Sequence, residues 1–199
     1  MADKYESFTE LSSAETEGDD FEVVLFDRGP LVVLAPHGGG IEPGTSEIAT
    51  EVAGEDLSLY IFEGLKRRGN VDLHITSHRF DEPRCRSLME NAESALAVHG
   101  CVDRSASDSV VFVGGSDTRL RSALVEELSR AGFPAEVDTM LSGEHLSNVC
   151  NRARDGGAQL EITERARLEM FRSLRRAGRR DPQSPFWDFC TAARAGFVR

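Results

Sequence analysis

The stretch that most constrains the fold is Leu31 to Ala49, LVVLAPHGGGIEPGTSEIA. It begins with an apolar run, Leu31 to Leu34, which is typical of a buried strand. A glycine-rich polar turn follows, and after Pro43-Gly44 a helical pattern begins, with Thr45 or Ser46 as a suitable N-cap. A buried strand that leads through a polar turn into a helix is typical of α/β proteins, which place functional groups at such strand ends.

Strands and helices alternate along the rest of the chain in the same way. We expect strands at Phe21–Phe26, Leu31–Pro36, Val71–Thr76, Ser94–His99, Ser109–Val113, Ala135–Asp138 and Ala158–Ile162. We expect helices at Thr45–Ala53 and Leu57–Arg68, from Pro83, at about Thr118–Ala131, and from about Glu164. The first two strands are spaced like a hairpin. This alternation predicts an α/β fold of three layers, α/β/α, with one mixed central sheet.

The chain of 199 residues suits a single domain that spans residues 1–199. Residues 1–20 are polar and predict an arm packed against the domain, and the tail, residues 176–199, contains an apolar segment, Phe186 to Phe189, expected to dock as a helix. The N-terminus lacks the features of a secretory signal and no apolar run could span a bilayer, so we expect a cytoplasmic protein without a membrane partner. The four cysteines form no CxxC pair, which predicts free thiols.

The formal net charge of −11 argues against a nucleic-acid-binding surface, because phosphate contacts need clustered basic residues. One segment is rich in arginine, Arg172 to Arg180 (RSLRRAGRR). It could form a polyanion site or the solvated end of a helix. We favour the helix end, since cations there suit the helix dipole.

Two histidines share a context: His37 and His99 each close an apolar strand and precede glycine, in LAPHGGG and LAVHGC. Because strand ends of an α/β sheet lie side by side, the two imidazoles can converge, and Glu42 follows His37 on the same loop. Two imidazoles and one carboxylate form a ligand set of catalytic zinc, and the intervening glycines let the loop fold back. The alternatives are histidines that merely cap strands, or an anion-binding nest, which does not explain Glu42.

Four further positions could carry chemistry. Glu161 lies between Leu160 and Ile162 on a strand and should point to the opposite face, where it could act as a base or remain a half-exposed strand residue. Asn151 and Arg152 lie in an irregular segment, and the guanidinium could bind a substrate carboxylate, stabilise an oxyanion or form a surface salt bridge. His74 and Arg79, near the end of the expected Val71–Thr76 strand, could line the same site.

Several of these segments occur together in a known order. APHGGGIEPGTSEIA, LHITSHRFDEP, AVHGC, VFVGGSD, NVCNR and GGAQLEI resemble the poly-γ-glutamate hydrolase family, zinc-dependent amidases of bacteria and their phages, from about Tyr5 to about Leu174. The resemblance implies a fold like that of zinc carboxypeptidases. It implies one zinc per chain with His37, Glu42 and His99 as ligands and Glu161 as the catalytic carboxylate, and Arg152 in substrate binding.

The predicted function is therefore a zinc amidohydrolase that cleaves γ-glutamyl or similar amide bonds of an acidic peptide or polymer, with zinc-activated water and Glu161 as general base. The alternatives are hydrolysis of small N-acyl amino acids or D-residue peptides, and non-catalytic recognition of acidic peptides. An acidic protein repels a polyanion, so the cleft would need local positive charge, for which zinc, Arg152 and Arg79 are available. The oligomeric state stays open.

Overall fold

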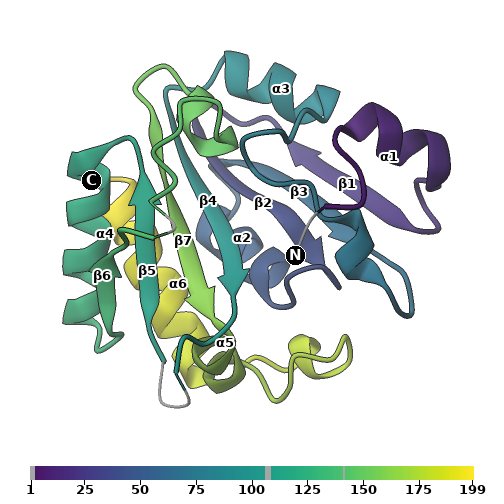
Figure 1. The fold of residues 1–199 in the computed structure, drawn as a ribbon. Helices are drawn as coiled ribbons and strands as arrows, with labels where there is room; N and C mark the ends of the chain where they lie inside the picture. The colour runs from purple at the N-terminus through teal and green to yellow at the C-terminus, as the bar shows by residue number, and fades with distance from the viewer. Residues whose placement is uncertain (1–2, 106–108, 141) are drawn as a thin grey trace.

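A computed structural model describes residues 3–105, 109–140 and 142–199. They form one seven-stranded sheet in the order β1-β3-β2-β4-β7-β5-β6 (Figure 1). Strands β3, β2, β4 and β7 are parallel, whereas β1 is antiparallel to β3 and β5 is antiparallel to β7. The mixed α/β sheet is confirmed. The strands are β1 (Phe21–Phe26), β2 (Leu31–Gly39), β3 (Ser58–Gly64), β4 (Ser94–Cys101), β5 (Val111–Gly115), β6 (Ala135–Val137) and β7 (Gly157–Thr163).

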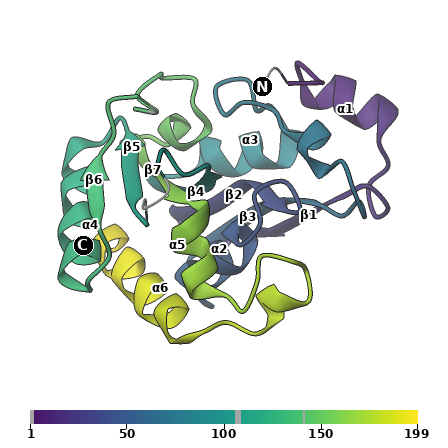
Figure 2. The same ribbon diagram turned by 60° about the horizontal axis from the view of Figure 1, so that its bottom comes forward.

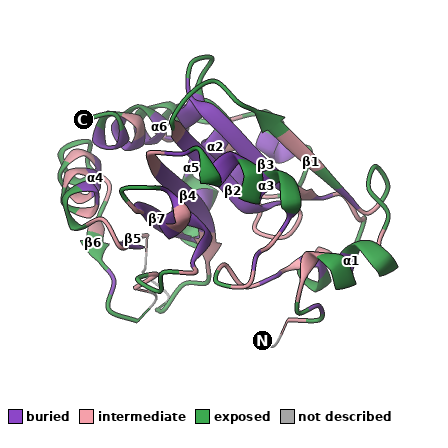
Figure 3. Cartoon of the chain, turned by 90° about the horizontal axis from the view of Figure 1, so that it is seen from above, coloured by how far each residue is buried: buried purple, intermediate pink, exposed green. Residues whose placement is uncertain are grey.

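Helices cover both faces of the sheet, which gives three layers (Figure 2). One apolar core lies between the sheet and α2 (Thr45–Ala53), α4 (Thr118–Arg130), α5 (Glu164–Met170) and α6 (Ser184–Phe197). The other core is covered by α1 (Phe8–Ala14), α3 (Pro83–Glu90) and the 3-10 turns η1 (Asn70–Leu73) and η2 (Val149–Arg152). Buried strands between more exposed helices are visible in Figure 3. The likeness to zinc carboxypeptidases remains a prediction.

The helix expected at Leu57–Arg68 is wrong, because this segment is the buried strand β3 (Ser58–Gly64). Tyr60, Ile61 and Phe62 are all buried, and successive side chains enter opposite cores. A strand that is covered on both faces reads as a continuous apolar run, which periodicity cannot distinguish from a buried helix. Its β-branched and aromatic residues favour the strand.

Two other local expectations are wrong. The hairpin of β1 and β2 does not form, because β3 inserts between them and pairs with both. The segment Val71–Thr76 is not a strand but the turn η1 followed by irregular chain. Leu73 and Ile75 are fully buried against the face of the sheet, so their alternation reflects packing onto the sheet rather than pairing within it.

The described N-terminal arm and the C-terminal helix both pack on the rest of the chain. In the N-terminal arm, Tyr5 and Leu11 are buried, and in α6 Phe186 and Phe189 are buried. Within the described ranges, no helix has the length and hydrophobicity that a bilayer crossing requires.

Candidate metal centre

The candidate site lies where β2 ends beside β4. The register of β2 shifts between Ala35 and Gly38, and Gly39 then turns with a φ of +65°. A Cβ atom on Gly39 would lie 2.6 Å from the carbonyl oxygen of Gly64, so only glycine fits this turn. The chain folds back at once, and the amide of Glu42 donates to the carbonyl of His37 at 2.8 Å. This local fold brings the carboxylate of Glu42 back to the imidazole of His37.

Three side chains converge on one point. His37 Nδ1 lies 3.0 Å from Glu42 Oε1 and 3.2 Å from His99 Nδ1, and His99 Nδ1 lies 3.5 Å from Glu42 Oε2. Ligand atoms bound about 2.0–2.1 Å from one tetrahedral zinc are about 3.3–3.4 Å apart. The three atoms are therefore already spaced as three corners of a zinc coordination sphere, and both histidines are buried.

The partners of these side chains fix which atoms face the centre. His37 Nε2 donates to the carbonyl oxygen of Ile75 at 2.8 Å, which in a neutral imidazole leaves the lone pair on Nδ1. The Nε2 atom of His99 lies 3.4 Å from the hydroxyl of Ser77, and the amide of Gly100 donates to Glu42 Oε2 at 2.9 Å. Such outer contacts orient ligating histidines and carboxylates. Two imidazole lone pairs and a carboxylate that face one another are the chemistry of a divalent cation site.

The charge state of Glu42 suits this role. Burial raises the pKa of the Glu42 carboxyl, but the positive charge and hydrogen bond that His37 and His99 provide in their protonated forms outweigh burial and hold the pKa well below its ordinary value. Glu42 is therefore ionised at neutral pH, which is the form that binds a metal.

Glu161 is placed beside this centre by strand register. On the neighbouring strand it is paired directly with His99, so both side chains leave the same face of the sheet. The amide of Gln159 donates to Glu161 Oε1 at 3.1 Å, and the amide of Asn148 donates to the oxygen of Gln159 at 2.8 Å. Glu161 lies in the wall of a cavity of about 270 Å³ whose other lining residues include Ser77, His78, Gly143, His145 and Asn148.

The surroundings of Glu161 favour its neutral form. Burial raises the pKa of the carboxyl to about 7, aided by the nearby charge of Glu42 and opposed by His99. A carboxyl whose pKa is near neutrality can accept a proton and return it.

The raised pKa predicts a pH-dependent stability of protein freed of metal by chelation. Below the ordinary pKa of 4.5, Glu161 is protonated in both folded and unfolded chains; as pH rises to about 7, only the unfolded chain gives up its proton. The free energy of unfolding should fall over this range by on the order of 3 kcal/mol relative to Glu161→Gln. Urea unfolding at a series of pH values measures it, and a difference between the two proteins that does not change with pH would contradict the raised pKa.

Asn151 and Arg152 contact the protein itself. Asn151 Oδ1 accepts from the amide of Ser116, and its Nδ2 donates to the carbonyls of Gly143 and His145. Arg152 donates to the carbonyl of Phe80 at 2.6 Å and to that of Ser147 at 3.0 Å. Both side chains therefore support the loops around the cavity that contains Glu161.

His74 and Arg79 both contact the N-terminal arm. His74 Nδ1 and Arg79 Nη2 lie 2.7 and 2.8 Å from the two carboxylate oxygens of Asp3. The His74 ring also lies over that of His37, with centroids 4.0 Å apart, and its Nε2 atom is 3.9 Å from Glu42 Oε1. The structure thus brings His74 next to the centre, while the charge of Arg79 is paired with the arm.

One supporting residue was missed from the sequence. Arg167 of α5 is buried and donates to the carbonyls of Pro43 at 2.7 Å, Cys101 at 2.9 Å and Ile162 at 3.1 Å. A single guanidinium thus ties the loop from His37 to Gly44, the metal loop, to the ends of β4 and β7. It also explains the glycine after His99, because a Cβ atom on Gly100 would lie 2.6 Å from Arg167 Cζ. An arginine on the apolar side of a helix, next to Ala166, is the only sequence signal.

Replacing Arg167 with methionine should lower the free energy of unfolding by about 1–3 kcal/mol, because the buried carbonyl of Ile162 and the partly buried carbonyls of Pro43 and Cys101 lose a charged donor. Urea unfolding of metal-free protein measures the change. The exposed Arg172 provides the matched control, and Arg172→Met should stay within about 0.5 kcal/mol of the unchanged protein. Equal midpoints for Arg167→Met and the unchanged protein would show that the three carbonyls do not depend on this side chain.

Comparison with known proteins identifies relatives of the whole chain. The sequence model of the poly-gamma-glutamate hydrolase family matches residues 5–192, which extends past Leu174, where the resemblance described above ended. UPF0714 protein YndL of Bacillus subtilis is 43% identical over 175 residues, which cover 85% of this chain and 67% of YndL.

Two solved structures are similar over almost their whole length. A bacteriophage poly-gamma-glutamate hydrolase has a TM-score of 0.95 and 32% identity, with 99% of this chain and 97% of that chain covered. The zinc-free apo form of YndL has a TM-score of 0.88 and 38% identity, with 96% and 95% covered.

Proposed function

The chain belongs to the poly-gamma-glutamate hydrolase family, a family of hydrolytic enzymes, and on this premise we propose that it is a zinc-dependent amidohydrolase that cleaves γ-glutamyl amide bonds of an acidic peptide or polymer. One observation carries the proposal. The three donor atoms of His37, Glu42 and His99 have the spacing of a zinc site, and Glu161 lies on the neighbouring strand in register with His99. The relative YndL has a form described as zinc-free, which supports zinc as the ion.

His37, Glu42 and His99 would hold the zinc. When bound, zinc supplies a Lewis acid that activates water and polarises the scissile carbonyl. Glu161 accepts the proton of the attacking water and returns it to the leaving amine, and its raised pKa suits both transfers. Gln159 keeps the carboxyl in place by its hydrogen bond to Oε1.

The cavity that contains Glu161 is the proposed place of the scissile amide. Its described wall carries hydrogen-bonding groups, Ser77, His78, His145 and Asn148, and the carboxylate of Glu144, but no arginine. We assign substrate contact to the hydrogen-bonding groups. Asn151 and Arg152 keep the loops in position, and His74 and Arg79 contact Asp3.

The test is a substrate panel. Zinc-loaded and chelator-treated protein are incubated with poly-γ-glutamate, poly-α-glutamate, small N-acyl glutamates and peptides of D-glutamate, and the products are identified by mass. We expect γ-linked fragments from zinc-loaded protein alone. Release only from N-acyl amino acids would assign the site to that reaction instead, and no cleavage of any substrate would support a binding protein.

A further inference from the structure

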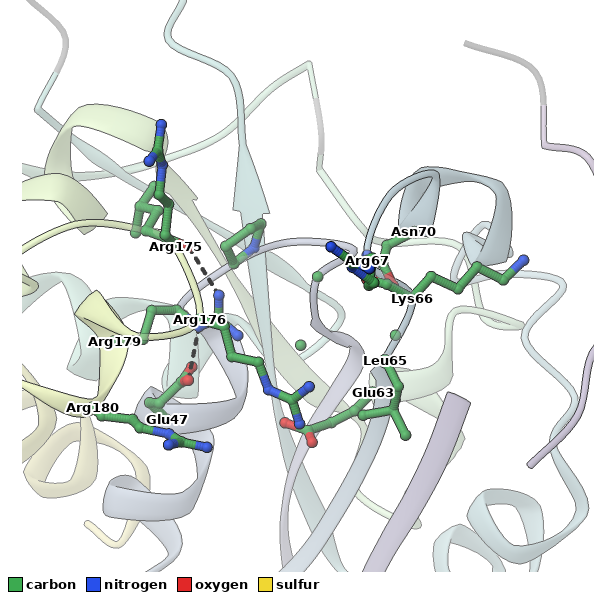
Figure 4. A pocket seen from close by; sticks show the side chains of 15 residues that line it. Glu47, Glu63, Leu65, Lys66, Arg67, Asn70, Arg175, Arg176, Arg179 and Arg180 are labelled. Atoms are coloured by element: carbon green, nitrogen blue, oxygen red, sulfur yellow. Dashed lines mark hydrogen bonds and ion pairs between the residues drawn. The ribbon is translucent and has the colours of Figure 1, made fainter. Parts of the chain in front are cut away.

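A second and larger cavity, of about 460 Å³, lies beside the metal loop (Figure 4). Its walls come from the metal loop and α2, from the end of β3 and the chain up to η1, and from the connection between α5 and α6. These lining residues include Gly39, Gly40, Pro43, Lys66, Arg67, Arg175, Arg176, Arg179 and Arg180.

Positive charge is concentrated in this cavity. Six of the lining residues are basic and two, Glu47 and Glu63, are acidic, in a chain whose net charge is −11. Lys66 pairs with Glu15 and Arg179 with Glu47. The side chains of the other four form no ion pair within the part of the chain that the structure describes; they are Arg67, Arg175, Arg176 and Arg180. Figure 4 shows Arg67 across the cavity from the other three.

The arginine-rich segment is not the helix end that its sequence favours. Helix α5 ends at Met170, and Arg172 to Arg180 form a loop that closes in the turn η3 (Gly178–Arg180). The buried Arg179 fixes this loop, since it donates to Glu47 of α2 and to the carbonyl of Leu174, both at 2.8 Å. The loop therefore lies beside α2 (Figure 2), and Arg175, Arg176 and Arg180 reach the cavity.

The cavity borders the candidate centre without being part of it. Gly39, Gly40 and Pro43 line it, and they share one loop with His37 and Glu42. It has no lining residue in common with the cavity of Glu161. A polymer bound at the metal centre would have to pass over this loop to reach the basic cavity.

The chemistry of the walls favours carboxylates over nucleic acid. Guanidinium groups pair with carboxylates and with phosphates through two parallel hydrogen bonds, so the other wall residues decide between the two. The described walls carry no aromatic side chain on which a base could stack, and two glutamates oppose a dense row of phosphates.

We propose that the basic cavity binds carboxylates of the γ-glutamyl polymer at residues away from the bond that is cut. This inference rests on the proposed function. The positive charge of the cavity would attract a polyanionic substrate to a protein whose net charge is negative. The cavity increases affinity for long chains and takes no part in the chemistry, so its effect depends on chain length and on salt.

Two sets of variants test this. The first is Arg175→Gln/Arg176→Gln/Arg180→Gln, with Arg67→Gln as a separate variant on the opposite wall. The matched control removes three exposed arginines outside the cavity and its loops, Arg86→Gln/Arg119→Gln/Arg154→Gln. We expect KM for long poly-γ-glutamate to rise about tenfold in the first set at low salt, less at high salt. Turnover of a γ-linked diglutamate, which is too short to extend beyond the cut bond, should not change.

A binding measurement separates this inference from the proposed function. Labelled poly-γ-glutamate is titrated, by fluorescence anisotropy, into zinc-loaded Glu161→Gln protein with and without the cavity substitutions. Weaker binding only with the cavity substitutions supports the site even if no hydrolysis is found with any substrate. Equal loss in the control, unchanged binding, or cavity-dependent binding of an oligonucleotide in preference to polyglutamate would overturn it.

Discussion

Replacing Glu161 with glutamine should lower hydrolysis of a γ-linked substrate by roughly 10²- to 10⁴-fold while zinc stays bound, since this is the usual contribution of a general acid–base group. Glutamine has the size of glutamate and can keep a hydrogen bond with Gln159, but its amide cannot accept a proton from water. The loss should fall on kcat rather than on KM, because the amide still fills the same place in the cavity.

The matched control is Glu136→Gln, an exposed strand glutamate outside the site, which should retain full activity. Steady-state rates and zinc content are measured on the same samples. Turnover of Glu161→Gln within a few-fold of the unchanged enzyme would remove Glu161 from the mechanism. A variant that loses zinc as well would show that its effect is structural.

The convergence of side chains at the ends of β2 and β4 could be predicted from sequence, because this geometry depends on few residues. His37 and His99 close neighbouring strands, and the glycine turn folds Glu42 back onto His37. The register of β4 with β7 then aligns Glu161 with His99. The convergence of His37, Glu42 and His99 uses local patterns and one rule of sheet topology, so it could be expected from sequence, whereas the pairing of β4 with β7 that aligns Glu161 was not predicted.

What could not be predicted depends on contacts between distant segments. Nothing near His74 or Arg79 indicates that Asp3, more than seventy positions earlier, contacts both. Arg167 likewise binds backbone carbonyls, and because every residue has one, no residue type in the sequence indicates these partners. The conformation of β3 depends on the whole sheet. Its apolar run would also suit a buried helix, but it forms a strand because β1 and β2 pair with it.

The prediction that the arginine-rich segment forms a helix end is wrong for a related reason. The composition of Arg172 to Arg180 suits a helix end, but the buried pair of Arg179 with Glu47 decides its path. A loop fixed in this way directs Arg175, Arg176 and Arg180 into the cavity beside the metal loop. Sequence alone assigns these residues to a solvated helix end, whereas the structure places them as the main source of positive charge in the cavity beside the metal loop.

Removing one imidazole should abolish zinc binding. We expect about one zinc per chain in the unchanged protein, and His37→Ala or His99→Ala should lose most of it on dialysis, because loss of an outer-shell partner alone weakens metal binding about 10- to 100-fold and a ligand contributes more. Both histidines are buried, so circular dichroism must first show that each variant folds. His145→Ala, an exposed histidine outside the centre, is the control and should retain zinc. Elemental analysis measures the metal. A His99→Ala protein that is folded and still holds one zinc would place the ion elsewhere. If both histidine variants lose zinc and Glu161→Gln retains it, the groups that bind the ion are distinct from the group that moves the proton.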